Sequence, residues 1–500
     1  MRYTRLALAL TLAGLALRLY HLGAPSYWFD EALEIRRAMT PWPQVVWLVE
    51  GPDPPLYRLL IAPLSRLSTV EAMLRLPSAL FGAAAVFLMY LWCAELGSRR
   101  VGVVAAALLA ISPVAVYYSQ EVSQYSAVIC LSLALLIAFE RVARRNRASD
   151  WLLATVVTLV SLYTYYGLAW LILVLEGWLL LQTWQRRDRG QWQRLALHYA
   201  ALLALLVILA VAFAVPQYEY QSRLRAAEAD TPQLGDTWQA VWANFAQGVW
   251  EGVIRFQTTL FGDAPQIISV ILAALILLGG IAAWRARARY RAVVGVGLTL
   301  LLVLYISDLA GLFYFGTRYS LPLLPLLILC LALALIVLWR THRLLGLTAG
   351  VFVVGVGVAF SPNLSLLPNP WLDLPREDLR PVIAYVNAHA QPDDEIYVYY
   401  GAAPAYRLYE PLPRHSTAYG SWFRDWPLSA KIDEIQRDTA GHSRVWLVMS
   451  HIHEAEDVQL LTGLQAARTS YVVQDEFSQR DALAVLLERS LLDERGPAIE

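Results

Sequence analysis

The stretch ISPVAVYYSQEVSQYSAVICLSLALL, residues 111 to 136, leaves one apolar segment and enters another through a short polar link. The link holds Gln120 and Glu121. A bilayer core about 30 Å thick needs roughly 20 apolar helical residues. Apolar runs of this kind recur near 4–20, 77–96, 101–118, 125–139, 151–166, 168–184, 196–215, 266–284, 292–307, 320–339 and 344–361. The pattern predicts about eleven transmembrane helices.

Composition places the whole chain in the same class. Apolar residues make up 58% and charged residues 16% of 500 positions, which exceeds the apolar share of ordinary soluble domains. The formal net charge is zero, whereas nucleic-acid partners are held by concentrated basic surfaces, so no nucleic-acid partner is expected. Cys93, Cys130 and Cys330 all lie in apolar runs and predict neither disulfides nor a metal site.

The arginines in the connections predict the orientation of the helices, because Lys and Arg of short loops stay on the cytoplasmic side. Eighteen arginines fall at the N-terminus and in the connections GSRR, ERVARRNRASD, QRRDRGQWQR, RARARYR and RTHR. The short connections of the opposite side hold one, Arg318. We therefore expect a multi-pass cell-membrane protein with a cytoplasmic N-terminus and with everything after about Ser361 outside.

Three long segments then fall outside: 21–76, 216–265 and 362–500. The first two are rich in Trp, Tyr and Pro, which suits helices lying in the headgroup layer beside membrane lipids. The last alternates helical and strand patterns and predicts an α/β domain with a mainly parallel sheet. The motif HIHEAE, residues 451 to 456, is interpreted there as solvated surface. The predicted organisation is a membrane module over 1–361 and an extracytoplasmic domain over 362–500.

Two adjacent carboxylates stand in the first outer segment, in YWFDEALEIRRA, residues 27 to 38. Asp30 precedes an amphipathic pattern, so one interpretation makes it a helix N-cap with Glu31 in the first turn. Charged groups close to lipid are costly, however, and are functional candidates by default. Helical spacing puts Asp30, Glu34 and Arg37 on one face and turns Glu31 toward another.

Further polar residues are predicted on the same outer side. In GPDPPLYRLL, residues 51 to 60, the prolines mark a loop-to-helix boundary, while Asp53, Tyr57 and Arg58 are candidates for a site. Arg318, in FYFGTRYSLPLLPLL, is either an anchor that reaches a lipid phosphate or a contact for the phosphate of a bound lipid substrate.

These stretches together resemble the GT-C superfamily of integral-membrane glycosyltransferases, specifically the bacterial relatives of the protein O-mannosyltransferases and of the lipid A aminoarabinose transferases. The matching pieces are FDEA, PPLY, RLPSALFGAAAVFLMY, ISPVAVYYSQEVSQYS and RYSLPLLP, within residues 1 to about 340. The resemblance implies the GT-C fold and the transfer of a sugar from a polyprenyl-phosphate carrier to an extracytoplasmic acceptor, which is a protein, a lipid or an envelope glycan. It also implies an acidic residue of the first outer loop at the reaction centre.

The chemistry of such a transfer assigns roles to the residues. An acceptor hydroxyl that attacks the anomeric carbon must lose a proton to a base, and direct displacement inverts the anomeric centre. Developing charge on the leaving phosphate is met by Arg or hydroxyl donors. No cofactor is predicted, although a divalent metal is not excluded. We expect Asp30 as base with Glu31 beside it, and donor-phosphate or acceptor contacts from Arg318, Tyr319, Arg36, Arg37, Arg58, Asp53, Tyr57, Gln120 and Glu121.

Two positions depart from the pattern of these relatives. Ser123 stands where relatives often carry Arg, and Tyr165 where they commonly carry His. A catalytically impaired homologue is therefore one alternative hypothesis. A transporter or flippase of lipid-linked glycans is another, although no internal repeat supports it. A membrane scaffold for the C-terminal domain is a third, which leaves Asp30 unexplained.

Overall fold

The computed structural model describes residues 2–42, 45, 54–186, 189–209, 265–309, 316–362, 377–410, 413–421, 427–452, 456–466 and 471–489. The predicted outer segment 216–265 lies outside these residues except for its last position, and so does Asp53. The chain forms two compact units. Unit 1 holds 1–22, 40–63 and 75–373, and unit 2 holds 23–39, 64–74 and 374–500.

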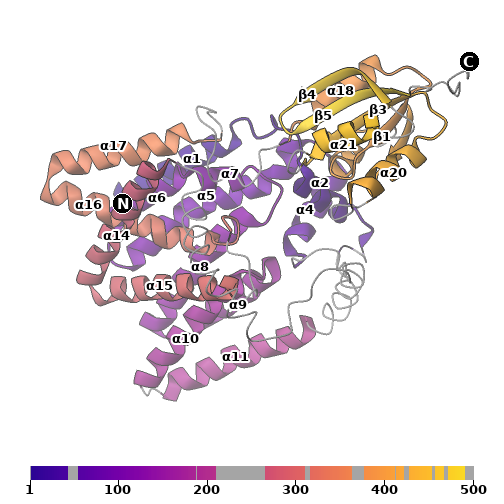
Figure 1. Cartoon of the computed structure of the whole chain (residues 1–500). Helices are drawn as coiled ribbons and strands as arrows, with labels where there is room; N and C mark the ends of the chain where they lie inside the picture. The colour runs from indigo at the N-terminus through magenta and orange to yellow at the C-terminus, as the bar shows by residue number, and fades with distance from the viewer. Residues whose placement is uncertain are drawn as a thin grey trace, which may run out of the picture. The chain divides into compact units, whose positions relative to one another are not determined.

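Unit 1 is helical (Figure 1). A helix occupies each of the eleven runs that the sequence predicts as spans, and α4 (Leu56–Leu67) lies between the first two of these runs. The other helices are α1 (Arg2–Leu19), α5 (Glu71–Glu95), α6 (Arg99–Ala110), α7 (Pro113–Tyr118), α8 (Tyr125–Arg145), α9 (Ala148–Thr164), α10 (Leu168–Arg186), α11 (Arg189–Leu209), α14 (Gln266–Arg285), α15 (Ala288–Leu309), the 3-10 turn η2 (Leu321–Leu323), α16 (Leu324–Thr341) and α17 (Arg343–Ala359).

Six helices among the described residues are long and apolar enough to cross a membrane, and two shorter ones, α9 and α17, are apolar as well. The chain is thus a multi-pass membrane protein, and the number eleven stays a prediction. The predicted span 101–118 is divided into α6 and α7. Ser112 and Pro113 explain the division, because the serine side chain accepts from Ala115 N and proline suits the first position of a new helix.

Close approaches between helices of unit 1 depend on small residues. A side chain at Gly279 of α14 would overlap the backbone carbonyl of Cys330 in α16. A Cβ on Gly102 of α6 would stand 2.8 Å from the carbonyl oxygen of Tyr90 in α5. The bundle encloses buried side chains such as Trp92. Small residues at crossings are how helices in membranes bring their backbones together.

Unit 2 contains a five-stranded sheet in the order β2-β1-β3-β5-β4, with helices around it (Figure 1). A mainly parallel sheet was expected, and this prediction is wrong for half of the pairings: β1 pairs parallel with β2 and β3, whereas β5 pairs antiparallel with β3 and β4. The strands are β1 (Glu395–Val398), β2 (Ser416–Tyr419), β3 (Arg444–Ser450), β4 (Tyr471–Gln479) and β5 (Ala482–Arg489).

A tight turn accounts for the antiparallel half of the sheet. Only Arg480 and Asp481 separate β4 from β5, and Asp481 has a left-handed backbone (φ 50°). A two-residue connection can join only antiparallel strands.

Helices cover the central strands β1 and β3, which are buried almost throughout. Tyr397 and Leu447 pack with Leu460 on one face, and Tyr385 stacks edge-on against Trp446 on the other. The helices of this unit are α2 (Phe29–Ala38), α18 (Leu379–His389), α19 (Ala403–Tyr409), α20 (Leu428–Asp438) and α21 (Glu456–Ala466). The helix α2, indigo in Figure 1, contacts α19 although the two are far apart in the sequence.

Candidate active site

The two adjacent carboxylates lie in the first turn of α2. The N-cap of α2 is Trp28, which has extended backbone angles and makes no capping hydrogen bond with its own side chain. The interpretation of Asp30 as N-cap is therefore wrong, because Asp30 follows the first helical residue. Asp30 and Glu31 lie near the positive end of the helix dipole and Arg36 and Arg37 near its negative end, which favours the helix at both ends.

The two carboxylates have different surroundings. Glu31 is 1% exposed, whereas Asp30 is partly exposed. One turn further along the helix, Glu34 pairs with Arg37 at 3.8 Å, as the predicted face requires. Asp30 is thus the carboxylate of the pair that a solvent-borne reactant can reach, and Glu31 is enclosed by protein.

Neighbouring segments of unit 2 hold both ends of α2. The Tyr27 backbone N–H donates to the Tyr409 hydroxyl (2.6 Å), which itself donates to Glu71 Oε1 (2.8 Å). At the other end, Arg66 Nη1 donates to the carbonyl oxygen of Ala38 (3.1 Å). The first and last turns of α2 are therefore tied to 64–74 and to α19.

A chain of hydroxyl groups runs through the outer-loop residues of unit 1. The Tyr57 hydroxyl of α4 is 2.7 Å from Ser78 Oγ of α5, and that serine donates to the carbonyl oxygen of Ser123 (3.1 Å). Ser123 Oγ is buried and has no hydrogen-bond partner among the described residues. Arg58, next to Tyr57, is 2% exposed. Tyr57 is thus joined to the link where relatives often carry Arg.

Gln120, in the same link, has a structural role because its side chain donates hydrogen bonds to backbone atoms. Its Nε2 donates to the carbonyl oxygens of Arg18 and Tyr20 (2.9 Å each), which closes the end of α1. Glu121 is 1% exposed in the same link. Gln120 thus satisfies backbone acceptors that a helix C-terminus leaves open.

Tyrosine rings surround the link on the side of α8. Tyr118 packs edge-on against Tyr125 at 5.1 Å, and Tyr125 packs against Tyr165 at 6.1 Å. Tyr165, at the position where relatives commonly carry His, is 3% exposed. A Cβ on Gly167 would overlap its ring, so only glycine leaves Tyr165 this room.

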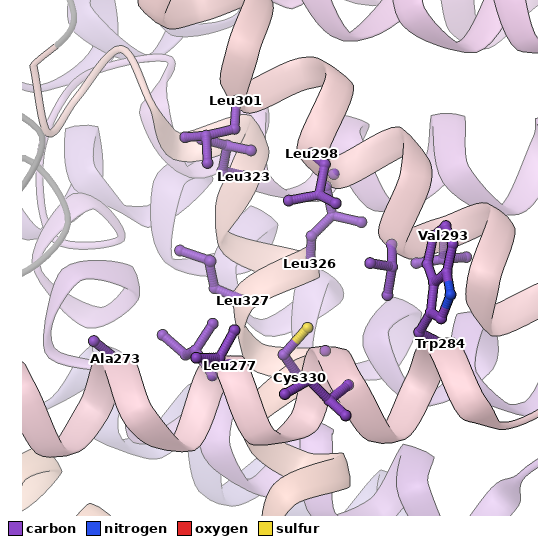
Figure 2. A pocket seen from close by; sticks show the side chains of 15 residues that line it. Ala273, Leu277, Trp284, Val293, Leu298, Leu301, Leu323, Leu326, Leu327 and Cys330 are labelled. Carbon is purple, nitrogen blue, oxygen red and sulfur yellow. The ribbon is translucent and has the colours of Figure 1, made fainter.

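Arg318 and Tyr319 lie in the turn before η2. Both are partly exposed, and the Arg318 guanidinium stands 5.9 Å from the centre of the Tyr319 ring. Just after this turn, η2 contributes Leu323 to an apolar cavity of about 550 Å³ between α14, α15 and α16 (Figure 2). Figure 2 shows leucines of all three helices and the Cys330 thiol around this space.

The predicted site residues therefore fall into two groups. Asp30, Glu31, Arg36 and Arg37 share α2 in unit 2, and the remaining described candidates lie in unit 1. Asp53 lies outside the described residues. Within the described ranges, His, Cys, Asp and Glu side chains form no group of three that could hold a metal ion.

Sequence reasoning missed several buried charged residues. His451 was interpreted as solvated surface, which is wrong: its side chain is 11% exposed and Nδ1 lies 2.9 Å from Glu377 Oε1. Arg18 is fully buried and donates to Ser119 Oγ (3.0 Å) and to backbone carbonyls. Arg18 had a sequence signal, since it is a cation inside an apolar run, thirteen positions after Arg5. Glu377 and His451 had no such sequence signal, because their partners are distant in the chain.

Several known proteins are similar to this chain in sequence or in structure. Residues 52–213 match the family model described as dolichyl-phosphate-mannose-protein mannosyltransferase. ArnT from Cupriavidus metallidurans matches in its apo state (TM-score 0.58, 14% identity, 96% of this chain and 97% of that one). The same protein bound to undecaprenyl phosphate matches at TM-score 0.54, with 14% identity and 97% of each chain covered.

A third structure is AglB from Archaeoglobus fulgidus, an archaeal oligosaccharyltransferase in complex with an inhibitory peptide and a dolichol-phosphate. It matches at TM-score 0.50 and 13% identity, over 99% of this chain and 75% of that one. The comparison with curated proteins gives no match.

The chain has the fold of these solved structures, so the predicted fold class, a polytopic helical membrane protein with a C-terminal α/β domain, is confirmed.

Proposed function

We propose that this protein transfers a sugar from a polyprenyl-phosphate carrier to a hydroxyl-bearing acceptor on the non-cytosolic side of the membrane. The observation that carries the proposal is the partly exposed carboxylate of Asp30 in the first turn of α2, in a chain with the GT-C fold. Charged residues close to apolar membrane segments are functional candidates by default.

The proposed reaction is a direct displacement. The acceptor oxygen forms a bond to the anomeric carbon, the bond from that carbon to the phosphate oxygen breaks, and the acceptor proton passes to the Asp30 carboxylate. The stereochemistry at the anomeric carbon inverts. Glu31, buried beside Asp30, orients the base, and the proposed phosphate contacts are Arg318 and Arg58.

The lipid part of the donor needs an apolar path. The cavity between α14, α15 and α16 is lined by carbon and sulfur atoms of this kind (Figure 2). One of its lining residues, Leu323, follows Arg318 closely in the chain. We assign the cavity to the isoprenoid tail, because its lining of apolar side chains matches an apolar chain. A similar structure, ArnT from Cupriavidus metallidurans, has been solved with undecaprenyl phosphate bound.

The proposed orientation follows from the arginine distribution. The N-terminus and the arginine-rich connections face the cytoplasm, and α2 with unit 2 faces the outside. The acceptor is then a protein, a lipid or an envelope glycan in the extracytoplasmic layer. The sugar is already activated by its phosphate ester, so the outer site needs no nucleotide.

The test is transfer of labelled sugar from a polyprenyl-phosphate donor, measured with the full chain in proteoliposomes. Asp30→Asn removes the base while it keeps the size of the side chain, so we expect the rate to fall about 100- to 10,000-fold. Asp433→Asn, at an exposed position of α20, is the matched control and should keep the wild-type rate.

Full transfer by Asp30→Asn would overturn the assignment of the base. Movement of the lipid-linked sugar across the bilayer without transfer, in the wild-type protein, would instead support a flippase. A catalytically impaired homologue is a second candidate because Ser123 stands at the position of the usual Arg and its buried hydroxyl lacks a partner among the described residues. That candidate predicts no transfer by the wild-type protein in the same assay.

A further inference from the structure

The helix α2 receives its N-terminal cap from another part of the chain. Its own N-cap, Trp28, offers no side-chain acceptor, yet the first N–H groups of a helix need one. The Phe29 backbone N–H points to Glu377 Oε1 at 3.4 Å. Glu377 lies 348 positions later in the sequence and belongs to the same unit.

Glu377 is held in place by His451. The His451 Nδ1 atom lies 2.9 Å from the same carboxylate oxygen, Oε1, and Glu377 is 1% exposed. The imidazole also contacts α2 directly, because the Phe29 ring stacks on it with centroids 4.5 Å apart and an angle of 15°. One carboxylate and one ring therefore contact the residue that immediately precedes Asp30.

The backbone fixes both members of this pair. His451 follows the last residue of β3 and has a left-handed backbone (φ 57°), an uncommon conformation for a residue with a side chain. Next to Glu377, the Asp378 N–H donates to the carbonyl oxygen of Arg480 in the β4–β5 turn (2.9 Å). The pair is thus tied to the sheet, His451 at the end of β3 and Glu377 next to a residue bonded to the β4–β5 turn.

The charge of the pair suits a helix start. Burial raises the pKa of Glu377, and the hydrogen bonds and charge of His451 oppose this rise. The Glu377 carboxylate lies at the positive end of the α2 dipole, and this position stabilises its ionised form. A carboxylate this deeply buried needs hydrogen-bond or charged partners. For Glu377 these partners include His451 Nδ1 and the Phe29 N–H.

We propose that Glu377 and His451 form a clasp that sets the position of the first turn of α2, and with it the position of Asp30. In this account they are positioning residues and do not touch substrate. The inference rests on the proposed function for its effect on turnover only, since the geometry of the clasp can be measured without any substrate.

The test compares Glu377→Leu with Glu377→Gln in the full chain, reconstituted in lipid nanodiscs, by hydrogen–deuterium exchange. Leucine removes the acceptor for the Phe29 N–H, so amides of residues 29–33 should exchange about 5- to 30-fold faster, the range expected for loss of a helix cap. Glutamine keeps an acceptor oxygen and should leave these amides within about twofold of wild type.

Glu434→Leu is the matched control. Glu434 is 2% exposed in the same unit and accepts from the Tyr397 hydroxyl (3.1 Å) and from the Ser421 backbone N–H (3.2 Å). Its loss disturbs the unit without removing the cap of α2. We expect α2 amides to exchange at the wild-type rate in this variant; equal acceleration by Glu434→Leu and Glu377→Leu would overturn the clasp.

Turnover gives a second readout. Displacement of the first turn should lower kcat by about 10- to 100-fold in Glu377→Leu, with the KM for the lipid donor within about twofold and with recovery in Glu377→Gln. A change in KM alone would overturn the positioning role. If α2 loosens as expected while Asp30→Asn keeps full transfer, the clasp stands and the proposed base falls. If α2 does not loosen, the clasp falls whatever Asp30 does.

Discussion

Arg18 illustrates at the scale of one residue how a charge is accommodated inside an apolar helix. Its guanidinium donates to Ser119 Oγ at 3.0 Å and to the carbonyl oxygens of Gly14 (2.9 Å) and Ala110 (3.1 Å). The cation is thereby surrounded by acceptors and joins α1 to the end of α6 and to the link after α7. Gly82 of α5 makes this arrangement possible, since a Cβ there would overlap Ser119 Oγ and stand 2.6 Å from Arg18 Nε.

Gly82→Ala should therefore destabilise the protein. The added methyl group must displace the Arg18–Ser119 hydrogen bond, at a cost of about 1–3 kcal/mol for an overpacked site. Gly355→Ala is the matched control, because Gly355 lies inside α17 and a Cβ there meets nothing within 4 Å. Thermal unfolding in detergent should show a lower Tm for Gly82→Ala only. Equal Tm values for the two variants would contradict the importance of this packing.

Single residues were predictable from sequence where a local rule applied. Asp30 and Glu31 could be singled out because two adjacent carboxylates follow the first apolar run, and charges close to lipid are costly. Gln120 was found but its contacts were not, since its acceptors lie at and just after the end of α1, about a hundred positions earlier. His451 was misinterpreted for the same reason: a short polar motif does not reveal a burial that arises from a distant helix and a distant glutamate.

At the scale of elements, the β4–β5 hairpin contains a titratable turn. The pKa of Asp481 is raised to about 7, first by burial and then by the negative charges of Glu377 and, to a smaller extent, Asp457. His451 and the Ile452 N–H act in the opposite direction and lower the pKa. A carboxyl whose pKa is raised on folding stabilises the fold when protonated. Its contribution is complete below the ordinary value near 4 and is lost as the pH rises through about 7.

Asp481→Asn mimics the protonated acid and tolerates the left-handed backbone of this position. We expect its gain in Tm over wild type to be near zero at pH 4, to grow as the pH rises, and to level off above about pH 7. Differential scanning fluorimetry across this range measures the gain. A gain that does not change with pH would show that the carboxylate of Asp481 is not the cause.

The secondary-structure elements were largely visible in the sequence. Apolar runs predicted the positions of the helices in unit 1, and the alternating helical and strand patterns after position 362 predicted the α/β character of the C-terminal segment. Two features escaped this reasoning. Strand direction depends on connections, and the two-residue turn at Asp481 makes half of the pairings antiparallel. The short strand β2 and helix α19 have too few residues for a clear period.

For the whole molecule, the arginine distribution predicts which side each connection faces, and cysteine labelling checks it. In a background without native cysteines, Tyr166→Cys between α9 and α10 and Gln465→Cys in α21 should react with a membrane-impermeant maleimide in intact cells. Thr341→Cys, at the end of α16, should react only after permeabilisation. All three positions are exposed. Labelling of Thr341→Cys in intact cells would reverse the proposed orientation.

The assembly of unit 2 was beyond prediction from the sequence. Its residues 23–39 and 64–74 precede most of the helical bundle in the chain, while its sheet follows the bundle. Composition separates an apolar module from a polar one, but the contacts that join Phe29 to Glu377 and Tyr27 to Tyr409 follow from no local pattern. Such long-range pairing is the part of a fold that periodicity does not encode.

Glu377, which caps α2, is synthesised long after α2 itself, and this order has a consequence for biosynthesis. A ribosome completes Phe29 long before it adds Glu377, so the helix with Asp30 leaves the exit tunnel without its distant acceptor. A polypeptide cut short by a premature stop codon never acquires that acceptor. We expect translation to end before this helix is fully ordered, so the proposed sugar transfer is expected of finished molecules only.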